Sequence, residues 1–352
     1  MKKHIFMIAG VLALLAAVSC KKDDPEPEIA TPQAYVLCEG SWGGNNATLD
    51  AVNLDEGTIK QGFFSEANGR GLGDLACDVV RYGSKLYVTV SESNKIEVVD
   101  PATGKSTKQI DMGDLYPRYI APHNGQLYVS CYNPHSVVRI DTATLTIAQT
   151  CQLGGNNPEQ LCVAGGNIYV CSGYIADAEG NYYYDSTLRV VRLANFTETG
   201  SITVGSNPKM VKVLDGTKIV VNCLGDYGAN PAKTVVVNTT DNSVTALPVA
   251  LTVFDVYNSN TIYGYATEYD ENWTPVAKFY RVDIATALSE EMLQSHASSL
   301  SAAYCLNVDP QKNLLFIGTG VYGANGDIFC FDLRGNKKWQ AETGLYPCKT
   351  VF

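Results

Sequence analysis

Residues 86–104 read LYVTVSESNKIEVVDPATG, and residues 127–144 repeat the same pattern as LYVSCYNPHSVVRIDTAT. Each copy consists of an apolar, β-branched strand, a polar loop, a second such strand that ends on aspartate, and a turn. Short apolar runs bounded by turn-forming residues are typical of strands. Because the pattern returns at a similar interval, it indicates a repeat architecture built from antiparallel units.

An apolar residue pair marks the second strand of this unit throughout the chain. Seven such pairs occur, at Tyr35-Val36, Tyr87-Val88, Tyr128-Val129, Tyr169-Val170, Val220-Val221, Tyr263-Gly264 and Phe316-Ile317. Their residue numbers differ by 41 to 53 from one pair to the next, which suits a four-stranded blade with loop insertions. The sequence therefore predicts an all-β chain that forms a seven-bladed β-propeller.

The strand after each pair ends on a residue that can cap a turn. Aspartate or asparagine occupies this position in six repeats, as Asn53, Asp100, Asp141, Asn238, Asp283 and Asp332. The side chains of these residues can accept hydrogen bonds from the backbone two residues further on. In the fourth repeat the pattern assigns the position to Ala194 and predicts no cap there.

The two ends of the propeller predict how the ring closes. An innermost strand precedes each apolar pair and often follows an X-Pro step such as Tyr116-Pro117. The first repeat, at Ala34, begins without that strand, whereas Tyr346-Pro347 introduces one that no pair follows. We expect Tyr346–Phe352 to pair beside Tyr35–Cys38. One C-terminal strand and three N-terminal strands would then share a blade and leave no open edge.

These repeats resemble those of the YncE or YVTN-type propellers, which run Pro, strand, Asp-Gly, Leu-Tyr-Val and then Val-Asp-Thr-Ala-Thr-Gly. The resemblance covers about residues 34–352. It implies the fold, but a propeller does not imply a chemistry.

The start of the chain has the pattern of a bacterial lipoprotein signal. Lys2 and Lys3 precede an apolar run, Ile5–Val18, that is short for a membrane span, and small residues stand before Cys20. We expect residues 1–19 to be a signal peptide, Cys20 to carry the lipid, residues 20–33 to be a flexible tether and residues 34–352 to be the propeller. A plain secretory signal that ends in cysteine is the alternative.

The first residues of the tether indicate where in the cell the protein is located. Lys22-Asp23-Asp24 resembles the surface-export signal of Bacteroidetes lipoproteins, which implies a lipid-anchored, cell-surface place on the outer membrane. An ordinary charged linker is the other interpretation.

Composition limits the possible partners. The formal net charge is −10 and the isoelectric point is about 4.9, so the protein lacks the basic surface that follows phosphates, and we expect no nucleic-acid partner. The hydrophobic content of 45% is ample for a large core.

The expected strand order separates the connections onto two faces. Tight turns such as Tyr82–Lys85, His123–Gln126 and Arg334–Lys337 belong to one face. Long loops with aromatic residues belong to the other, where a broad amphipathic ligand could bind. The candidate ligand-binding residues are Trp42, Tyr116, Arg118, Tyr132, Asn133, Glu159, Tyr174, Tyr183, Lys209, Tyr227, Tyr269, Trp273, Tyr322 and Tyr346. For any single tyrosine, packing between blades is the alternative role.

Together with the lipoprotein start, the chain resembles the BtuG-type surface lipoproteins that capture cobalamin for an outer-membrane transporter. The resemblance implies cobalamin or a related corrinoid as ligand and a TonB-dependent transporter as partner. It also implies membrane contact through the lipid anchor only, with no cofactor and no catalysis. Two alternatives stay open: an oligosaccharide as ligand, or a polysaccharide lyase or hydrolase with paired carboxylates such as Asp226 and Asp270.

Other reactive residues do not form a recognisable site. The ten cysteines after Cys20 contain no CxxC and recur at equivalent repeat positions, which favours buried free thiols over disulfides or metal ligands. His135 and His296 are expected on the loop-rich face, where a solvated histidine is the commoner case than a ligand. Residues 177–181 have oxygen ligands but lack the calcium-loop spacing.

Overall fold

The computed structural model describes residue 29, residues 31–272 and residues 274–352. The predicted signal peptide, Cys20, most of the tether and Trp273 lie outside the described residues.

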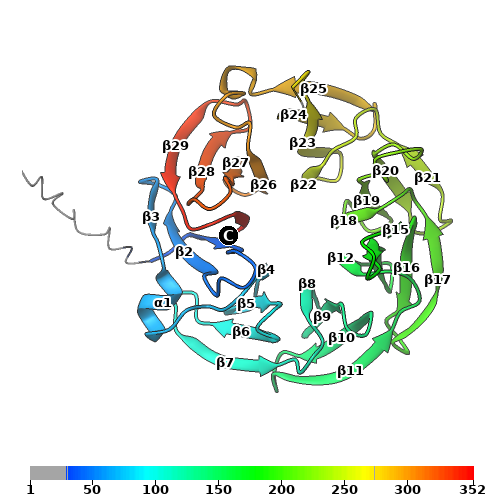
Figure 1. Cartoon of the computed structure of the whole chain (residues 1–352), viewed down its shortest axis with the longest axis horizontal. Coiled ribbons are helices and arrows are strands. Elements are labelled where there is room, and N and C mark those ends of the chain that lie inside the picture. The colour runs from blue at the N-terminus through cyan, green and yellow to red at the C-terminus, as the bar shows by residue number, and fades with distance from the viewer. Residues whose placement is uncertain (1–28, 30, 273) are drawn as a thin grey trace, which may run out of the picture.

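Seven four-stranded antiparallel sheets form a ring, which confirms the predicted propeller (Figure 1). The strands of each blade are given from the innermost to the outermost; blade 1 is β30 (Pro347–Val351), β1 (Ala34–Cys38), β2 (Thr48–Asn53) and β3 (Thr58–Lys60). Blade 2 is β4 (Ala76–Tyr82), β5 (Lys85–Val90), β6 (Lys95–Val99) and β7 (Ser106–Asp111). Blade 3 is β8 (Pro117–His123), β9 (Gln126–Cys131), β10 (Ser136–Asp141) and β11 (Thr146–Gln152), and blade 4 is β12 (Pro158–Ala164), β13 (Asn167–Ser172), β16 (Thr187–Arg192) and β17 (Thr197–Thr203). Blade 5 is β18 (Pro208–Val213), β19 (Lys218–Cys223), β20 (Lys233–Asn238) and β21 (Val244–Ala246); blade 6 is β22 (Val253–Asn258), β23 (Thr261–Tyr269), β24 (Pro275–Asp283) and β25 (Leu288–Met292); and blade 7 is β26 (Ala303–Asp309), β27 (Leu314–Thr319), β28 (Asp327–Asp332) and β29 (Lys337–Glu342).

Blade 1 closes the ring as the sequence predicts. The C-terminal strand β30 pairs antiparallel with β1, with Tyr35 opposite Val351 and Leu37 opposite Lys349. The backbone N–H of Thr350 also donates to the Asn307 side chain of blade 7, at 2.8 Å. The last strand therefore completes one blade and ties it to its neighbour, and it removes the open edge that a linear chain would leave.

The turn caps are also confirmed. Each of the six side chains accepts a hydrogen bond of 2.8 to 3.0 Å from a backbone N–H of the following turn. The donor is the residue two positions further on for Asn53, Asp100, Asp141, Asn238 and Asp332. For Asp283 the donor is the residue three positions further on.

In the fourth repeat, however, the predicted position was wrong. Strand pairing places Asn167 opposite Arg192, as Gln126 lies opposite Asp141, so the equivalent residue is Arg192 and not Ala194. The sequence pattern was misread because Leu193 and Ala194 follow an apolar strand without a polar residue that marks its end.

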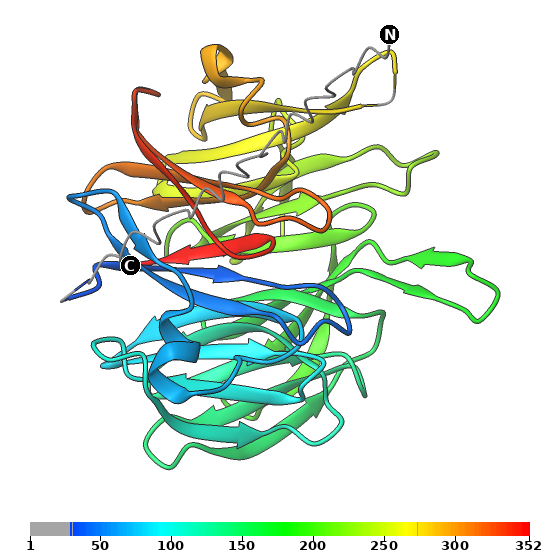
Figure 2. The same cartoon turned by 60° about the vertical axis from the view of Figure 1, so that its left-hand side comes forward.

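One feature stands out from the ring. Strands β14 (Tyr174–Ala176) and β15 (Tyr182–Tyr184) form a separate two-stranded sheet inserted between β13 and β16. Figure 2 shows this hairpin, in green, projecting from the body of the propeller. The sequence predicted a loop without structure of its own, but two short runs of tyrosine and isoleucine have high strand propensity and pair across a turn.

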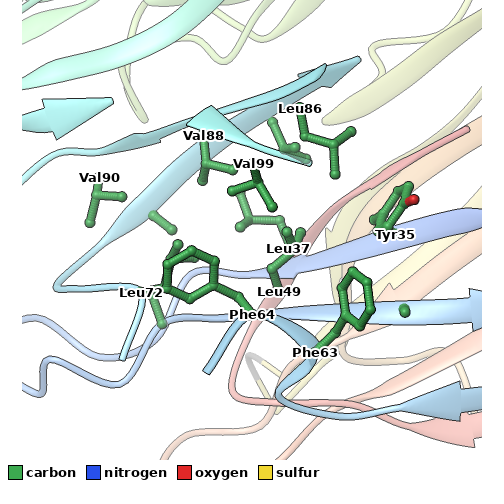
Figure 3. Close-up of a cluster of buried hydrophobic side chains, with 14 residues drawn as sticks. Tyr35, Leu37, Leu49, Phe63, Phe64, Leu72, Leu86, Val88, Val90 and Val99 are labelled. Atoms are coloured by element: carbon green, nitrogen blue, oxygen red, sulfur yellow. The ribbon is translucent and has the colours of Figure 1, made fainter. Parts of the chain in front are cut away.

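Neighbouring blades pack through apolar clusters. Figure 3 shows the cluster between blades 1 and 2, in which Leu37 and Leu49 pack with Val88 and with two phenylalanines of helix α1 (Phe63–Asn68). This helix lies between β3 and β4 and was not predicted, because a helix of six residues, less than two turns, has no extended hydrophobic period to detect. Complete burial of a side chain such as Phe64 contributes about 1.5–3 kcal/mol.

The described residues contain one further short helical turn, η1 (Gln294–His296), before β26. Within the described part of the chain, no helix has the length and apolar character that crossing a membrane requires.

Candidate ligand-binding face

Antiparallel strand order places the connections on two opposite faces. We call the face that carries the second-to-third strand connections and the blade-to-blade connections the loop face, and the opposite one the turn face. The turn face carries the tight turns between β4 and β5, β8 and β9, and β28 and β29, as the sequence predicts. The loop face carries the longer insertions, including residues 39–47, 173–186 and 224–232.

Exposed aromatic side chains are confined to the loop face. Of the described residues, eight tyrosine and tryptophan side chains are exposed, and all eight belong to its connections or to the strand ends beside them: Trp42, Tyr174, Tyr182, Tyr183, Tyr227, Tyr269, Tyr304 and Tyr322. The exposed fraction reaches 77% for Trp42, 80% for Tyr227 and 95% for Tyr322. Large aromatic groups left in solvent on one side of a protein mark an interaction surface.

Four tyrosines on this face surround a pocket of about 420 Å³, which we call the tyrosine pocket. Its lining is Tyr174, Tyr182, Tyr184, Asn207, Lys209, Leu224 and Tyr227. The ring of Tyr182 stacks on that of Tyr184 at 6.2 Å between centroids, and Tyr184 meets Tyr227 at 6.5 Å. Three of the tyrosines come from the β14–β15 hairpin of blade 4 and one from blade 5, so the pocket lies across two blades.

Pairing in the hairpin explains which tyrosines line the pocket. Tyr174 lies opposite Tyr184, and Tyr182 is two residues before Tyr184, so these three side chains share one face of the hairpin. Tyr183 points to the other face, where its hydroxyl donates to Asp177 at 2.9 Å. From the sequence, all four tyrosines lie in one long aromatic loop, and the candidate ligand-binding residues included Tyr174 and Tyr183 but not Tyr182 and Tyr184. Successive side chains of a strand point to opposite faces. If the hairpin had been recognised from the sequence, this alternation would have placed Tyr182 and Tyr184 on one face and Tyr183 on the other.

A second pocket of about 420 Å³ adjoins the tyrosine pocket. It shares Leu224 and Tyr227 with the first and extends to Leu251, Thr267 and Tyr269 of blade 6. Tyr227 therefore forms the wall between two hollows of the loop face.

A cavity of about 410 Å³ occupies the centre of the ring, and we call it the channel. Its lining comes mostly from the innermost strands and includes Glu39, Cys77, Arg118, Tyr119, Lys209 and Tyr304. Lys209 lines both this cavity and the tyrosine pocket, so the two spaces meet at that side chain.

The predicted residues Arg118, Glu159 and Lys209 come together at this point. The Lys209 ammonium lies 2.7 Å from one oxygen of the Glu159 carboxylate, and the Tyr132 hydroxyl donates to the other at 2.7 Å. Glu159 is only 1% exposed. Burial alone would raise the pKa of Glu159, but the positive charges of Lys209 and Arg118 outweigh it and lower that pKa below the ordinary value.

Arg118 is held by aromatic faces and a thiol. Its guanidinium carbon lies 4.7 Å from the centroid of the Tyr132 ring and 5.8 Å from that of Tyr119. One terminal nitrogen donates to the Cys77 sulfur at 2.9 Å. Burial raises the pKa of the Cys77 thiol to about 12, although the Arg118 charge acts in the opposite direction.

The structure places the remaining predicted residues in three different settings. Tyr116 and Tyr346 are half-buried in the left-handed backbone region, with φ of 51° and 56°, and Tyr346 packs on Tyr304 at 5.4 Å. Asn133 is exposed, and its side chain donates to the Asp114 carbonyl at 3.1 Å. Trp42 and Tyr322 are exposed but line neither pocket beside Tyr227.

Among the candidate residues, Tyr132 has the environment that differs most from the one expected from the sequence. The sequence placed it among the loop aromatics that could contact a ligand, whereas it is half-buried between Arg118 and Glu159. Arg118 and Glu159 each follow the proline that begins an innermost strand, and both lie against Tyr132 at the end of β9. The sequence does not reveal this contact, because the three residues come from separate strands.

The residues considered for catalysis or metal binding have structural partners. Asp226 accepts bonds from the backbone of Gly228 and Asn230, and Asp270 accepts bonds from Asn272 and Thr274, so each carboxylate caps its own loop. The ten described cysteines are free thiols and nine are buried, as predicted. Within the described part of the chain, no three histidine, cysteine or acidic side chains are grouped closely enough to bind a metal ion.

Comparison with known proteins supports the fold alone. No family model matches the chain. No curated protein matches it either. A solved structure of hydrazine synthase from Kuenenia stuttgartiensis is similar with a TM-score of 0.61 and 15% sequence identity, over 76% of this chain and 85% of that one. At that identity, the likeness concerns the propeller architecture and carries no function.

Proposed function

We propose that this chain is a non-catalytic, lipid-anchored surface protein that captures cobalamin or a related corrinoid on the loop face and passes it to a TonB-dependent outer-membrane transporter. The observation that carries the proposal is the confinement of all eight exposed tyrosine and tryptophan side chains of the described residues to one face of the ring. The resemblance of the repeats to YncE-type propellers and of the whole chain to BtuG-type lipoproteins supports the choice of ligand.

The geometry suits a broad ligand that has both apolar and polar edges. A corrin ring is a flat macrocycle surrounded by amides, and tyrosine combines a large apolar face with a hydroxyl that can bond to an amide. The tyrosine pocket and the hollow beyond Tyr227 form adjacent depressions rather than one deep slot. Such a surface contacts a wide ligand at several points.

An oligosaccharide is the second candidate. Sugar rings also stack on exposed aromatic side chains, and Trp42, Tyr227 and Tyr322 offer such platforms on three blades. A lyase or hydrolase is less well supported, because Asp226 and Asp270 are engaged in capping their own loops.

Titration calorimetry of the chain beginning at Ala34, which contains every strand of the closed ring, with cyanocobalamin tests the ligand. Saturable heat and a change in the absorption of the corrin are expected. If both are absent at micromolar protein, the corrinoid proposal is wrong, and a glycan array then tests the second candidate. Product released from a polysaccharide would instead show an enzyme.

The anchor is tested separately. In cells fed a labelled fatty acid, the native chain should incorporate the label and Cys20→Ala should not. Digestion of the protein by protease added to intact cells would support surface exposure, and protection from it would contradict this part of the proposal.

A further inference from the structure

We propose that Arg118 forms an anion-binding site in the channel, which receives a phosphate or carboxylate group of the ligand. The proposal rests on the proposed capture function insofar as it names the part of the ligand that enters the ring. The anion-binding site itself is inferred from the contacts of Arg118 in the structure.

The first observation is that Arg118 has no direct ion-pair partner among the described residues. The three lysines that line the channel each lie beside a carboxylate: Lys209 with Glu159 at 2.7 Å, Lys212 with Asp255 at 2.7 Å and Lys349 with Asp78 at 2.5 Å. Among the described residues, no carboxylate lies within ion-pairing distance of Arg118. The nearby Glu159 lies outside that distance, and its ion-pair partner is Lys209.

The second observation is the unused donor capacity of the guanidinium. Arginine has five N–H donors, and one terminal nitrogen of Arg118 bonds to Cys77, which is a weak acceptor. The buried Nε has no hydrogen-bond partner. Leaving a buried charged donor unpaired is costly, and the Tyr132 and Tyr119 rings offset only part of that cost.

The third observation is the space in front of this group. Arg118 lines the channel of about 410 Å³, which meets the tyrosine pocket at Lys209. The planar guanidinium matches two oxygens of a carboxylate or phosphate, and its aromatic neighbours hold it in one plane. A ligand covering the loop face can therefore insert an acidic group here while its larger part rests on the tyrosines.

Among the described residues that line the channel, Glu39 is the other charged group without an ion pair. The Glu39 carboxylate accepts the Tyr304 hydroxyl at 2.6 Å and lines the same cavity. The Glu39 carboxylate would repel a bound anion. Removing its charge should therefore strengthen anion binding, whereas removing the Arg118 charge should weaken it.

The experiment titrates the purified protein with phenyl phosphate, benzoate and benzyl alcohol, which share an aromatic ring and differ in the acidic group. We expect phenyl phosphate or benzoate to bind at least about tenfold more tightly than benzyl alcohol. Whichever acid binds more tightly identifies the phosphate or the carboxylate as the preferred group. Arg118→Gln should lose about tenfold or more of that affinity, and Arg118→Lys should retain part of it, because lysine keeps the charge but not the planar pair of donors.

Two further variants decide the outcome even if Arg118→Gln folds poorly. Glu39→Gln should bind the preferred acid several-fold more tightly than the native protein, whereas Arg334→Gln, on the turn face, should leave its affinity unchanged. Equal affinity of the three probes, or no gain in Glu39→Gln, overturns the anion site. Loss of cyanocobalamin binding with intact anion binding contradicts the proposed ligand but not the site, so the two proposals can fail separately.

Discussion

The Lys209 ammonium lies 2.7 Å from the Glu159 carboxylate and joins the innermost strands of blades 4 and 5 at the boundary between the channel and the tyrosine pocket. Tyr132 of blade 3 donates to the same carboxylate. Three blades therefore meet at one buried acid, and one of the joined residues, Lys209, also lines both the channel and the tyrosine pocket.

Glu159→Gln should destabilise the protein at pH 7 and should cost less stability at pH 3. The positive neighbours lower the folded-state pKa of Glu159 below its ordinary value of 4.5, so its contribution is present above that value and is lost as the pH falls through the folded-state pKa. We expect a cost of about 3 kcal/mol at pH 7, the low end for a broken buried pair, because Lys209 is partly exposed.

Urea unfolding at both pH values measures this cost. Glu66→Gln, which removes an exposed ion pair with Lys60, is the control and should change the free energy of unfolding by less than about 1 kcal/mol. The same loss at pH 3 and pH 7 for Glu159→Gln would show that the carboxylate charge is not what stabilises the junction.

Tyr227→Ala should weaken binding of the captured ligand by about 1–3 kcal/mol, because this side chain forms the wall between two pockets. Its stability should stay within about 0.5 kcal/mol of the native value, since the side chain is 80% exposed. Calorimetry with the ligand and a thermal melt give the two quantities. Lys337→Ala on the turn face is the matched control, and an equal loss of affinity there would place the ligand on the wrong face.

Tyr132→Ala should behave differently from Tyr227→Ala. It removes a hydrogen bond to Glu159 and the aromatic face under Arg118, so a fall in stability of about 1–3 kcal/mol is expected. Tyr132→Phe keeps the ring and should lose only the hydrogen-bond part. A melting temperature unchanged in both variants would mean that the junction does not contribute to stability.

Deletion of residues 346–352 should prevent cooperative folding. Without β30, the inner edge of β1 is open, and the bond from Thr350 to Asn307 is lost. Size-exclusion chromatography and a thermal melt should show aggregation or the absence of a transition. Phe352→Ala, which removes a ring packed on Phe316 but leaves the strand, should still melt cooperatively. Native-like melting of the deletion variant would refute the closure argument.

Arg192→Asp should stabilise the protein by about 0.5–1.5 kcal/mol, because it restores the turn cap that six other blades have. Arg192→Ala removes the same side chain without adding an acceptor and should show no such gain. Asp141→Ala should lose a similar amount at the equivalent position of blade 3. Chemical unfolding compares all three, and a gain equal to that of the alanine variant would argue against capping.

The amino-acid sequence was sufficient for the blade count, the closure of the ring and the capped turns. These features depend on local chemistry that recurs: a β-branched strand around Tyr87, an aspartate, Asp100, at the end of the next strand, and a last strand from Pro347 that pairs with β1. A weak local pattern becomes reliable when it recurs, because each repeat provides an independent example of the same strands and turns. The asymmetry between the two faces followed from the same strand order.

The composition of the site depended on the tertiary structure. Tyr182 and Tyr184 could be separated from Tyr183 only once the hairpin pairing was known, because one residue of register moves a side chain to the opposite face. The junction of Tyr132, Glu159 and Lys209 joins residues from three blades whose separation in sequence says nothing of their contact. Ring closure brings these blades together around one axis, and only the resulting distances show which charges form ion pairs and that, among the described residues, Arg118 forms none.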